Sequence, residues 1–374
     1  METLIRRLHD SPARLVIAVT GGGVGLLAAL TSVPGASRTL LGAAVPYSAA
    51  ALRRYIGGEP EGACSARTAS DMALAALARA SEFAPEADRD LLGVGITCGL
   101  ATDRERRGEN RCFVAVVGRG GELHRGLTLT KGARSRTEEE RVVSDLALAT
   151  ILRMAGIDGG PELELLEGER VAATTPGVEY RMARLADGRL DRVALNGAGE
   201  LVGGENPSAL LAGSYNPLHA GHRALLAAAG HEVGVAVTAE ISIENVDKPL
   251  LDAEEVLRRV GRFAADDRVF VTRAATFREK AWLFPGVTFV IGVDTAERLV
   301  AAQYYGDNEV EMRAALSEIR AAGCRFLVAG RVDGAGRFGT LADVAIPAEF
   351  APLFGELPEA RFRADVSSSE IRDA

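Results

Sequence analysis

The residue types and spacing that most clearly indicate chemistry lie in the segment Gly213–His222, which reads GSYNPLHAGH. His219 and His222 are three residues apart, so in a helix their imidazoles lie on one face of one turn. Gly213 lets the chain turn and lets a ligand approach the backbone, and Gly221 leaves the face between the histidines open. Two imidazoles beside the free N–H groups of a helix start can donate hydrogen bonds to phosphate oxygens. This combination favours a phosphate site over two structural histidines that cap a turn.

A second segment suited to phosphate comes near the end of the sequence, where Ser367, Ser368 and Ser369 precede Glu-Ile-Arg. Three hydroxyls at an expected helix start can bond phosphate oxygens, and the guanidinium of Arg372 adds a charged, fork-shaped donor. Serine is also a common helix cap, so this segment is weak evidence by itself. Beside the histidine segment it gains weight as part of the same phosphate site.

The elements that must position these segments follow from the second half of the sequence, where apolar runs of strand length alternate with helical stretches. We expect strands at Ala209–Ala212, Val233–Val237, Val269–Thr272, Thr288–Gly292 and Phe326–Ala329. We expect helices at Ala220–Ala229, Asp252–Ala264, Thr295–Ala302 and Val310–Ala321. This alternation predicts an α/β fold with a Rossmann-like, doubly wound parallel sheet. Ligands of such sheets bind beyond the carboxyl ends of the strands, and Gly213 directly follows one of them.

The first half of the sequence predicts a separate α/β domain over residues 1–157. We expect strands at Leu15–Val19, Leu91–Ile96, Cys112–Val117 and Glu122–Leu129, and helices at Val24–Leu30, Ser65–Phe83 and Thr137–Met154. Thr137 and Glu140 are spaced as a capping box for the last helix. Residues 158–205 are expected to be a linker with a small β element, in which Asp187-Gly188 forms a hairpin turn. Residues 206–374 form the second domain.

Composition limits the classes of partner and compartment. A length of 374 residues predicts two domains, and the net charge of −8 argues against a nucleic-acid or anionic-membrane binder. The four cysteines include no Cys-x-x-Cys pair, so they predict neither a metal cage nor a disulfide set. Between Arg14 and Arg38 the chain carries no charge, but Thr20–Gly23 interrupts this window. We therefore expect a cytoplasmic protein with no membrane span, and we expect a homo-oligomer.

The histidine segment, followed far downstream by Ser-Ser-Ser-Glu-Ile-Arg, resembles the paired motifs of the nucleotidylyltransferase superfamily. That superfamily carries His-x-Gly-His and then Ser-Ser-Thr-x-x-Arg, and Ser369 keeps the hydroxyl of the threonine. Phe289–Asp294 is similar to the strand-end Gly-x-Asp of the nicotinamide mononucleotide adenylyltransferase branch. Lys248 falls where that branch places a phosphate-binding lysine, and Arg331 is a fainter match. For Lys248 and Arg331, an ordinary surface residue is about as good an interpretation. The resemblance covers residues 209–374 and includes cytidylyltransferases.

This resemblance implies in-line attack of an acceptor phosphate on the α-phosphate of a nucleoside triphosphate, with Mg²⁺ bridging the phosphates and pyrophosphate leaving. The catalytic residues that it implies are His219, His222, Lys248 and Arg372. The nucleotide-binding residues that it implies are Gly213, Ser214, Tyr215, Gly221, Gly292, Asp294, Ser367, Ser368 and Ser369. Asp294 would orient a ribose or the metal. The expected substrates are ATP or CTP and a small phosphorylated acceptor, with no metal held by the protein alone.

The first half contains four short segments in a characteristic order, Val19–Gly22, Pro34–Ser37, Pro46–Ser48 and Gly62–Ser65. Together they resemble the CinA carboxy-terminal domain, a family that includes nicotinamide mononucleotide amidohydrolases. The resemblance covers about residues 12–157. The family places a serine nucleophile two residues before the threonine of Thr-Gly-Gly, where this sequence has Ala18. Where the family has a lysine, this sequence has Ala51 and Leu52. Because amide hydrolysis by this route needs an activated hydroxyl, we expect no such activity.

Several functions remain open. We favour nicotinamide mononucleotide as the acceptor, because both halves resemble families that handle it, which is an association and not a mechanism. Pantetheine phosphate, glycerol phosphate and choline phosphate are alternative acceptors. An amidohydrolase and a non-catalytic nucleotide-binding protein are alternatives of other classes. Class I tRNA synthetases share a similar histidine signature, but this chain lacks a Lys-Met-Ser-Lys type of loop.

Overall fold

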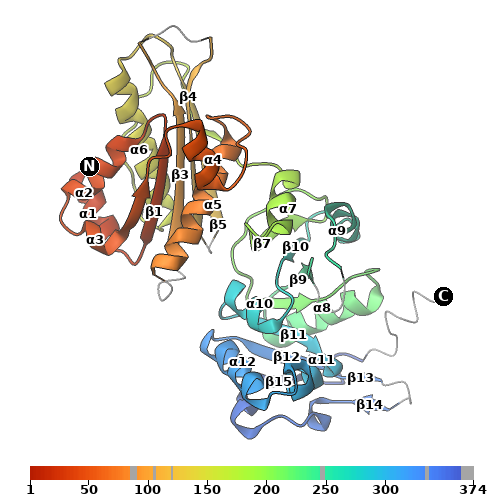
Figure 1. Ribbon diagram of the computed structural model, residues 1–374. Coiled ribbons are helices and arrows are strands. Elements are labelled where there is room, and N and C mark those ends of the chain that lie inside the picture. The colour runs from red at the N-terminus through yellow and green to blue at the C-terminus, as the bar shows by residue number, and fades with distance from the viewer. Residues whose placement is uncertain (85–90, 104–106, 119–120, 245–248, 333–336, 364–374) are drawn as a thin grey trace. The chain divides into compact units, whose positions relative to one another are not determined.

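The computed structural model describes residues 1–84, 91–103, 107–118, 121–244, 249–332 and 337–363. The chain folds into two compact units, Met1–Tyr180 and Arg181–Ala374. Each unit carries its own sheet and helices (Figure 1), so the predicted α/β class is confirmed in both.

The first unit is built on a six-stranded sheet in the order β2-β1-β3-β4-β5-β6. Its strands are β1 (Arg14–Thr20), β2 (Leu40–Ala44), β3 (Leu91–Gly99), β4 (Asn110–Gly118), β5 (Gly121–Leu129) and β6 (Ala172–Ala173). β1 pairs in parallel with β2 and β3, whereas β3 to β6 pair in antiparallel fashion. The apolar run of β1 is buried over Leu15–Thr20, as expected of a strand covered on both faces.

Helices cover the two faces of this sheet. They are α1 (Glu2–His9), α2 (Val24–Ser32), α3 (Ala36–Thr39), α4 (Ala49–Ile56), α5 (Ala66–Phe83) and α6 (Arg136–Met154). α5 packs closely on β3 because Gly93 and Gly95 have no side chain. A Cβ at either position would lie 2.1 Å from a carbonyl oxygen of α5, that of Ala73 or Ala69. The opposite face forms a core in which residues of α2 and α6 pack against β1, β3 and β4.

The predicted cap of α6 is wrong by two residues. Ser135, not Thr137, is the N-cap, and Glu138 completes the capping box. The carboxylate of Glu140 instead accepts hydrogen bonds from the backbone N–H groups of Gly23 and Gly25, at 2.8 and 2.9 Å. Glu140, which the local pattern assigned to the cap of α6, therefore makes a tertiary contact to the start of α2.

The second unit is built on a seven-stranded sheet in the order β15-β12-β11-β8-β9-β10-β7. Its strands are β7 (Arg192–Asn196), β8 (Ala209–Ala212), β9 (Val237–Ser242), β10 (Arg268–Thr272), β11 (Thr288–Gly292), β12 (Arg325–Ala329) and β15 (Phe354–Leu357). All neighbours pair in parallel except β7, which is antiparallel to β10. A separate two-stranded ribbon joins β13 (Arg331–Val332) to β14 (Phe338–Gly339). The predicted Rossmann-like parallel sheet is confirmed.

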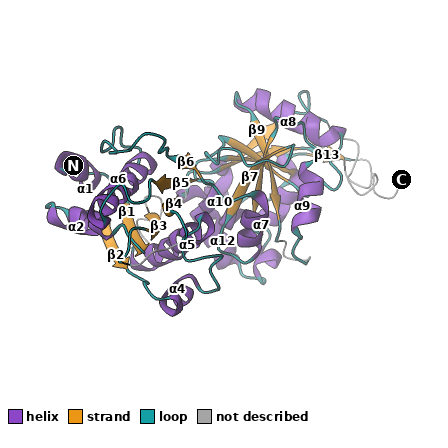
Figure 2. Cartoon of the chain, turned by 90° about the horizontal axis from the view of Figure 1, so that it is seen from above, coloured by secondary structure: helices purple, strands orange, loops and turns teal. Residues whose placement is uncertain are grey.

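The helices of this unit connect successive strands. They are α7 (Val178–Ala186), α8 (Ala220–Val233), α9 (Ala253–Val260), α10 (Phe277–Leu283), α11 (Val293–Leu299) and α12 (Glu309–Ala321), with 3₁₀ turns at Ala302–Tyr305, Leu341–Asp343 and Ala348–Leu353. Right-handed crossovers place α8 and α9 on one face and α10 to α12 on the other, because the chain moves in opposite directions across the sheet. Figure 2 shows α8 and α12 on either side of the strands.

Two local predictions for the second half are wrong. Val233–Val237 is not a strand, because α8 continues to Val233 and β9 begins only at Val237. Asp187-Gly188 is not a hairpin turn, because it follows the end of α7, where Gly188 adopts a φ of 74°. Within the segment 158–205, the contact-based division of the chain falls between Tyr180 and Arg181, and β7 forms the edge of the second sheet.

The helices also bear on the question of a membrane span. Among the residues that the structure describes, no helix combines the length and the apolar character needed to cross a membrane.

Candidate nucleotide site

The histidine segment lies where the second sheet changes direction. From β8 the chain proceeds to β9 and β10 on one side, and it then returns to β11 on the other side of β8. In doubly wound sheets the crevice at such a switch point, beyond the carboxyl ends of the strands, is the usual ligand site. The loop after β8 is the segment Gly213–His219, and β11 is followed directly by Val293 and Asp294. The topology therefore brings two of the predicted segments to one edge of the sheet.

The loop after β8 turns sharply and is held by its own tyrosine. The backbone N–H of Gly213 donates to the carbonyl of Glu240 at 3.0 Å, which ties the loop to β9. Tyr215 is fully buried, has a φ of 45°, and donates its hydroxyl to the carbonyl of Leu211 at 2.7 Å. Burial, with the nearby Glu240 carboxylate, raises the pKa of Tyr215 well above 10, so this hydroxyl stays protonated. The side chain of Tyr215 is therefore a buried structural anchor of the loop.

The two histidine rings lie against each other, tilted by 31°, at the start of α8. Their ring centroids are 3.8 Å apart, and His219 is the N-cap residue of the helix. The backbone N–H of His219 donates to Nδ1 of His222 at 3.3 Å. This bond makes Nδ1 an acceptor, so the proton of the neutral ring lies on Nε2. The ring of Tyr215 contacts His222 at a centroid distance of 4.9 Å and limits its orientation.

Burial favours the neutral form of both imidazole rings. Burial, and to a smaller extent the adjacent His219, lowers the pKa of His222 from 6.5 to about 4. Burial also lowers the pKa of His219. A neutral imidazole with its proton on Nε2 can donate a hydrogen bond to a phosphate oxygen without first gaining a charge. The pair is therefore suited to hold phosphate oxygens through hydrogen bonds.

The two glycines of the segment give these rings their room. A Cβ on Gly221 would lie 3.1 Å from both Cε1 and Nδ1 of His219. A Cβ on Gly213 would lie 3.0 Å from the ring of Tyr215. Each glycine thus allows a ring to lie against the backbone, which explains why these two positions are occupied by glycine.

Two arginines of α9 donate hydrogen bonds to the loop that follows β8. Arg259 is buried and donates to the carbonyl of Ser214 at 2.9 Å. Arg258 donates to the side-chain oxygen of Asn216 at 3.2 Å. Glu255 accepts from both guanidinium groups at 2.7 Å, and these bonds lower the pKa of its carboxyl to about 2. Sequence reasoning missed this support, because its bonds to the loop cross more than forty residues.

The Gly-x-Asp element after β11 forms a charged contact at the same edge of the sheet. Gly292 is the N-cap residue of α11, and a Cβ there would meet nothing within 4 Å. Asp294 lies in the first turn of α11, and its carboxylate accepts from Arg331 at 2.8 Å. The structure thus brings the fainter candidate Arg331 into direct contact with Asp294, and both side chains are partly exposed. Asp294 remains the candidate contact for a ribose or a metal, and Arg331 is its ion-pair partner.

The remaining predicted site residues are not placed. Lys248 lies in the segment 245–248, and Ser367, Ser368, Ser369 and Arg372 lie in the segment 364–374. Both segments fall outside the described residues.

In the first unit, the Thr-Gly-Gly turn carries no nucleophile at the expected position. Ala18 is fully buried in β1, opposite Ala44 and Gly95 on the neighbouring strands. Arg136 donates to the carbonyl of Gly21 at 2.8 Å, and Glu140 accepts from N–H groups at the start of α2. An internal carboxylate therefore occupies the place where an anionic ligand would contact this helix start.

Two family models match the chain. Residues 210–374 match the cytidylyltransferase-like family, and residues 1–154 match the CinA C-terminal domain. These matches agree with the two resemblances that the sequence motifs carry. The chain thus carries a segment that matches the CinA C-terminal domain, followed by one that matches the cytidylyltransferase-like family. The second match supports a nucleotidyltransferase.

Solved structures similar to this chain cover 41% of it. The competence/damage inducible protein CihA from Agrobacterium tumefaciens is 27% identical, with 94% of that chain covered and a TM-score of 0.35. A competence-damaged protein (CinA) superfamily protein from Escherichia coli is 20% identical, with 87% of that chain covered and a TM-score of 0.34. No curated protein matches the chain.

Proposed function

We propose that the protein transfers a nucleotidyl group from ATP or CTP to a small phosphorylated acceptor and releases pyrophosphate. The observation that carries this proposal is the adjacent pair of rings, His219 and His222, at the switch point of the sheet. The match of residues 210–374 to the cytidylyltransferase-like family supports the same reaction class.

In this reaction a phosphate oxygen of the acceptor attacks the α-phosphorus of the nucleoside triphosphate. A new P–O bond forms, the bond between the α-phosphorus and the bridging oxygen of the β-phosphate breaks, and pyrophosphate takes the electron pair. No covalent enzyme intermediate is needed, so catalysis depends on positioning and on stabilising developing negative charge. His219 and His222 would donate hydrogen bonds to the phosphate oxygens. Lys248, Ser367–Ser369 and Arg372 would complete the site.

Mg²⁺ is expected to accompany the nucleoside triphosphate. Within the described part of the chain, no group of three or more histidine, cysteine, aspartate or glutamate side chains could hold a metal ion. In nucleotide sites, Mg²⁺ is held mainly by substrate phosphates and water, with one or two carboxylates from the protein. Asp294, a partly exposed carboxylate at this edge, is the side chain that would contact it. When bound, Mg²⁺ would neutralise charge on the phosphates.

We favour nicotinamide mononucleotide as the acceptor, on the argument that both halves resemble families that handle this molecule. This argument is an association between domains and not a feature of the site. Pantetheine phosphate, glycerol phosphate and choline phosphate are the other acceptors to test.

Hydrolysis of the nicotinamide mononucleotide amide is a second candidate, because residues 1–154 match the CinA C-terminal domain. The route of that family needs a serine hydroxyl where this chain has the buried Ala18. We therefore expect no ammonia release from nicotinamide mononucleotide. Restoring the hydroxyl with Ala18→Ser tests whether the missing group alone accounts for this.

The experiment is pyrophosphate release by the full chain with Mg²⁺, nicotinamide mononucleotide, and ATP or CTP in parallel. Omitting the acceptor and substituting His222→Ala are the controls, and ammonia is measured in the same reactions. Release that requires both substrates and is lost in the variant would support the transferase and identify its donor. If no acceptor in the panel gives release with either donor, the proposed function is wrong and a binding-only protein is favoured.

A further inference from the structure

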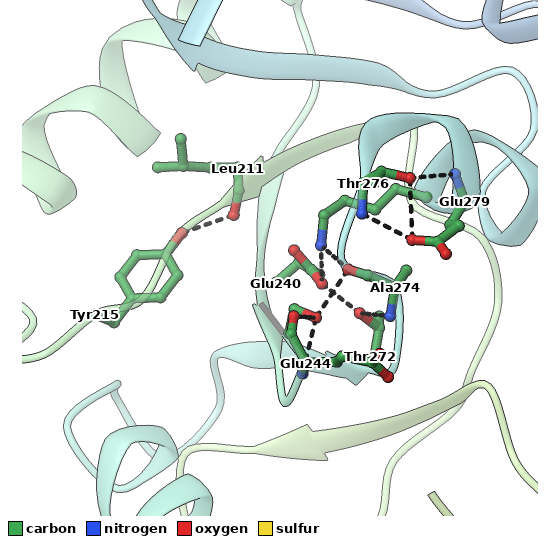
Figure 3. A network of polar contacts seen from close by, with 10 residues as sticks. Leu211, Tyr215, Glu240, Glu244, Thr272, Ala274, Thr276 and Glu279 are labelled. Carbon is green, nitrogen blue, oxygen red and sulfur yellow. Dashed lines mark hydrogen bonds and ion pairs between the residues drawn. The ribbon is translucent and has the colours of Figure 1, made fainter. Parts of the chain in front are cut away.

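A buried ion pair lies beside the loop that carries the histidines and takes no part in the chemistry described above. Lys280 on α10 donates to Oε1 of Glu240 on β9 at 2.6 Å. The side chains of Lys280 and Glu240 are 6% and 1% exposed. Lys280 also donates to the carbonyl of Ala274 at 2.8 Å, and the hydroxyl of Thr272 donates to the same Oε1 of Glu240. Figure 3 shows Glu240, Thr272 and Ala274 of this group close together.

The position of Lys280 is fixed from its own helix. Thr276 is the N-cap residue of α10, and its backbone N–H and hydroxyl both donate to Glu279, at 2.8 and 3.0 Å. The N–H of Lys280 in turn donates to the carbonyl of Thr276 at 3.0 Å. A capped first turn therefore holds the ammonium group against Glu240.

Glu240 joins this pair to the histidine loop. Its backbone carbonyl accepts from the N–H of Gly213, the first residue of the loop, and its Cα lies opposite Ala212 at the end of β8. Its carboxylate is close enough to Tyr215 to raise the pKa of that hydroxyl. Glu240 therefore connects the ion pair to Gly213 through a backbone hydrogen bond, and its charge lies near Tyr215.

Stability alone is a poor reason for this arrangement. Desolvation of two charges offsets much of their attraction, so a buried ion pair is often matched by apolar residues of similar volume. In addition, Oε2 of Glu240 is buried and has no hydrogen-bond partner among the described residues. A buried acceptor without a partner costs roughly 1–3 kcal/mol. A charged pair that leaves an oxygen unsatisfied is better explained by the geometry that it imposes.

We propose that Glu240 and Lys280 are positioning residues of the nucleotidyl-transfer site. The pair fixes the carboxyl end of β9, and through Gly213 and Tyr215 it sets the path of the loop that carries His219 and His222. This inference concerns the arrangement of the loop, and its consequence for turnover rests on the proposed function.

The test compares amide hydrogen exchange of the segment 212–222 in the full chain and in Glu240→Gln/Lys280→Met, which removes both charges together. Arg278→Met is the matched control, because Arg278 lies on the same helix and pairs with Glu311 and Glu318 of α12 instead. We expect exchange in this segment to be at least tenfold faster in the double variant and unchanged in the control. Wild-type exchange in a folded double variant would overturn the proposal.

Thr272→Val covers the case in which the double variant does not fold. This change keeps both charges and removes one hydrogen bond to Glu240. We expect exchange in the segment 212–222 to be about threefold faster, and wild-type exchange here would then overturn the proposal.

The kinetic readout separates positioning from simple loss of stability. With the donor found for the wild-type protein, we expect the double variant to lower kcat at least tenfold, with KM for the nucleotide within twofold. A folded double variant that keeps the wild-type kcat would contradict the positioning role. If the wild-type protein itself shows no transfer, the proposed function fails, and hydrogen exchange still decides whether the pair positions the loop.

Discussion

Replacing Gly221 by alanine separates helix stability from the placement of the histidines. Gly221 lies in the first turn of α8, and its φ is not positive. Alanine is favoured over glycine in a helix interior by about 1 kcal/mol, so the substitution does not weaken the helix itself. The new Cβ would nevertheless lie 3.1 Å from Cε1 and Nδ1 of His219. The ring has to move by a few tenths of an ångström to restore an ordinary contact.

The expected effect on turnover follows from that displacement. A misplacement of 1 Å can cost about a hundredfold in rate, so a shift of about half that size costs about tenfold. We therefore expect Gly221→Ala to lower kcat about tenfold while the melting temperature stays the same or rises. The assay is pyrophosphate release under saturating substrates, with thermal unfolding followed on the same preparation.

Gly355→Ala is the matched control for this prediction. Gly355 lies in β15, and a Cβ there would meet the carbonyl oxygen of Phe326 at an ordinary 3.8 Å. We expect this variant to keep wild-type turnover. The reasoning is refuted if Gly221→Ala also keeps wild-type kcat, or if it loses activity only because the protein unfolds.

Three further predictions concern side chains in both units. His222→Ala should lower kcat about a hundredfold with the fold intact, because it removes a donor to the developing charge; an unchanged kcat would remove the residue from the site. Arg259→Met should lower kcat about tenfold, since the carbonyl of Ser214 loses its buried donor. A variant that loses thermal stability but keeps wild-type kcat would contradict this. In the first unit, burial by itself would raise the pKa of the Glu169 carboxyl. Hydrogen bonds from Arg134 and from backbone N–H groups outweigh this effect and lower the pKa from 4.5 to about 2. Glu169 therefore stabilises the fold above pH 4.5, and this contribution is lost as pH falls toward 2. Glu169→Ala should cost about 3 kcal/mol at pH 7 and flatten the pH dependence of urea unfolding over that range; a wild-type slope would show that the pair does not control it.

The parts of the fold that the sequence predicts well are those with a local signal. β8 and β11 have the predicted bounds, because each is a short apolar run whose end is marked by glycine. α12 was predicted within one residue of its bounds, since its apolar positions recur at helical spacing. The histidine pair was recognised for the same reason, because residues three apart at a helix start need no distant partner to lie together.

The failures occur where two local patterns compete. The run from Val233 to Val237 reads Val-Gly-Val-Ala-Val, which is rich in β-branched residues and fits a strand. In the structure, α8 extends through Val233, and Gly234 with a φ of 73° ends it. At α6 the Ser/Thr-x-x-Glu pattern occurs twice, two residues apart, and periodicity cannot choose between Ser135 and Thr137. The choice is settled by tertiary contact, because Glu140 bonds the start of α2.

The supports of the site were missed because their partners are distant in sequence. Arg259 contacts the loop across 45 residues, and Lys280 contacts Glu240 across 40. Neither residue belongs to a motif, and a buried arginine or lysine is rare enough that composition alone predicts an exposed one. Only the sheet order, which places β9 next to β8, reveals why these two side chains lie beside the loop.

The most direct test of the central claim follows the α-phosphate of the donor. The full chain is incubated with Mg²⁺, nicotinamide mononucleotide and ATP or CTP labelled at the α-phosphate, with His222→Ala in parallel. We predict that the label appears in a dinucleotide containing the acceptor, at a rate equal to pyrophosphate release, and that the variant forms this product about a hundredfold more slowly. Label recovered only as unreacted triphosphate with every acceptor, or dinucleotide formed equally fast by the variant, would contradict the account.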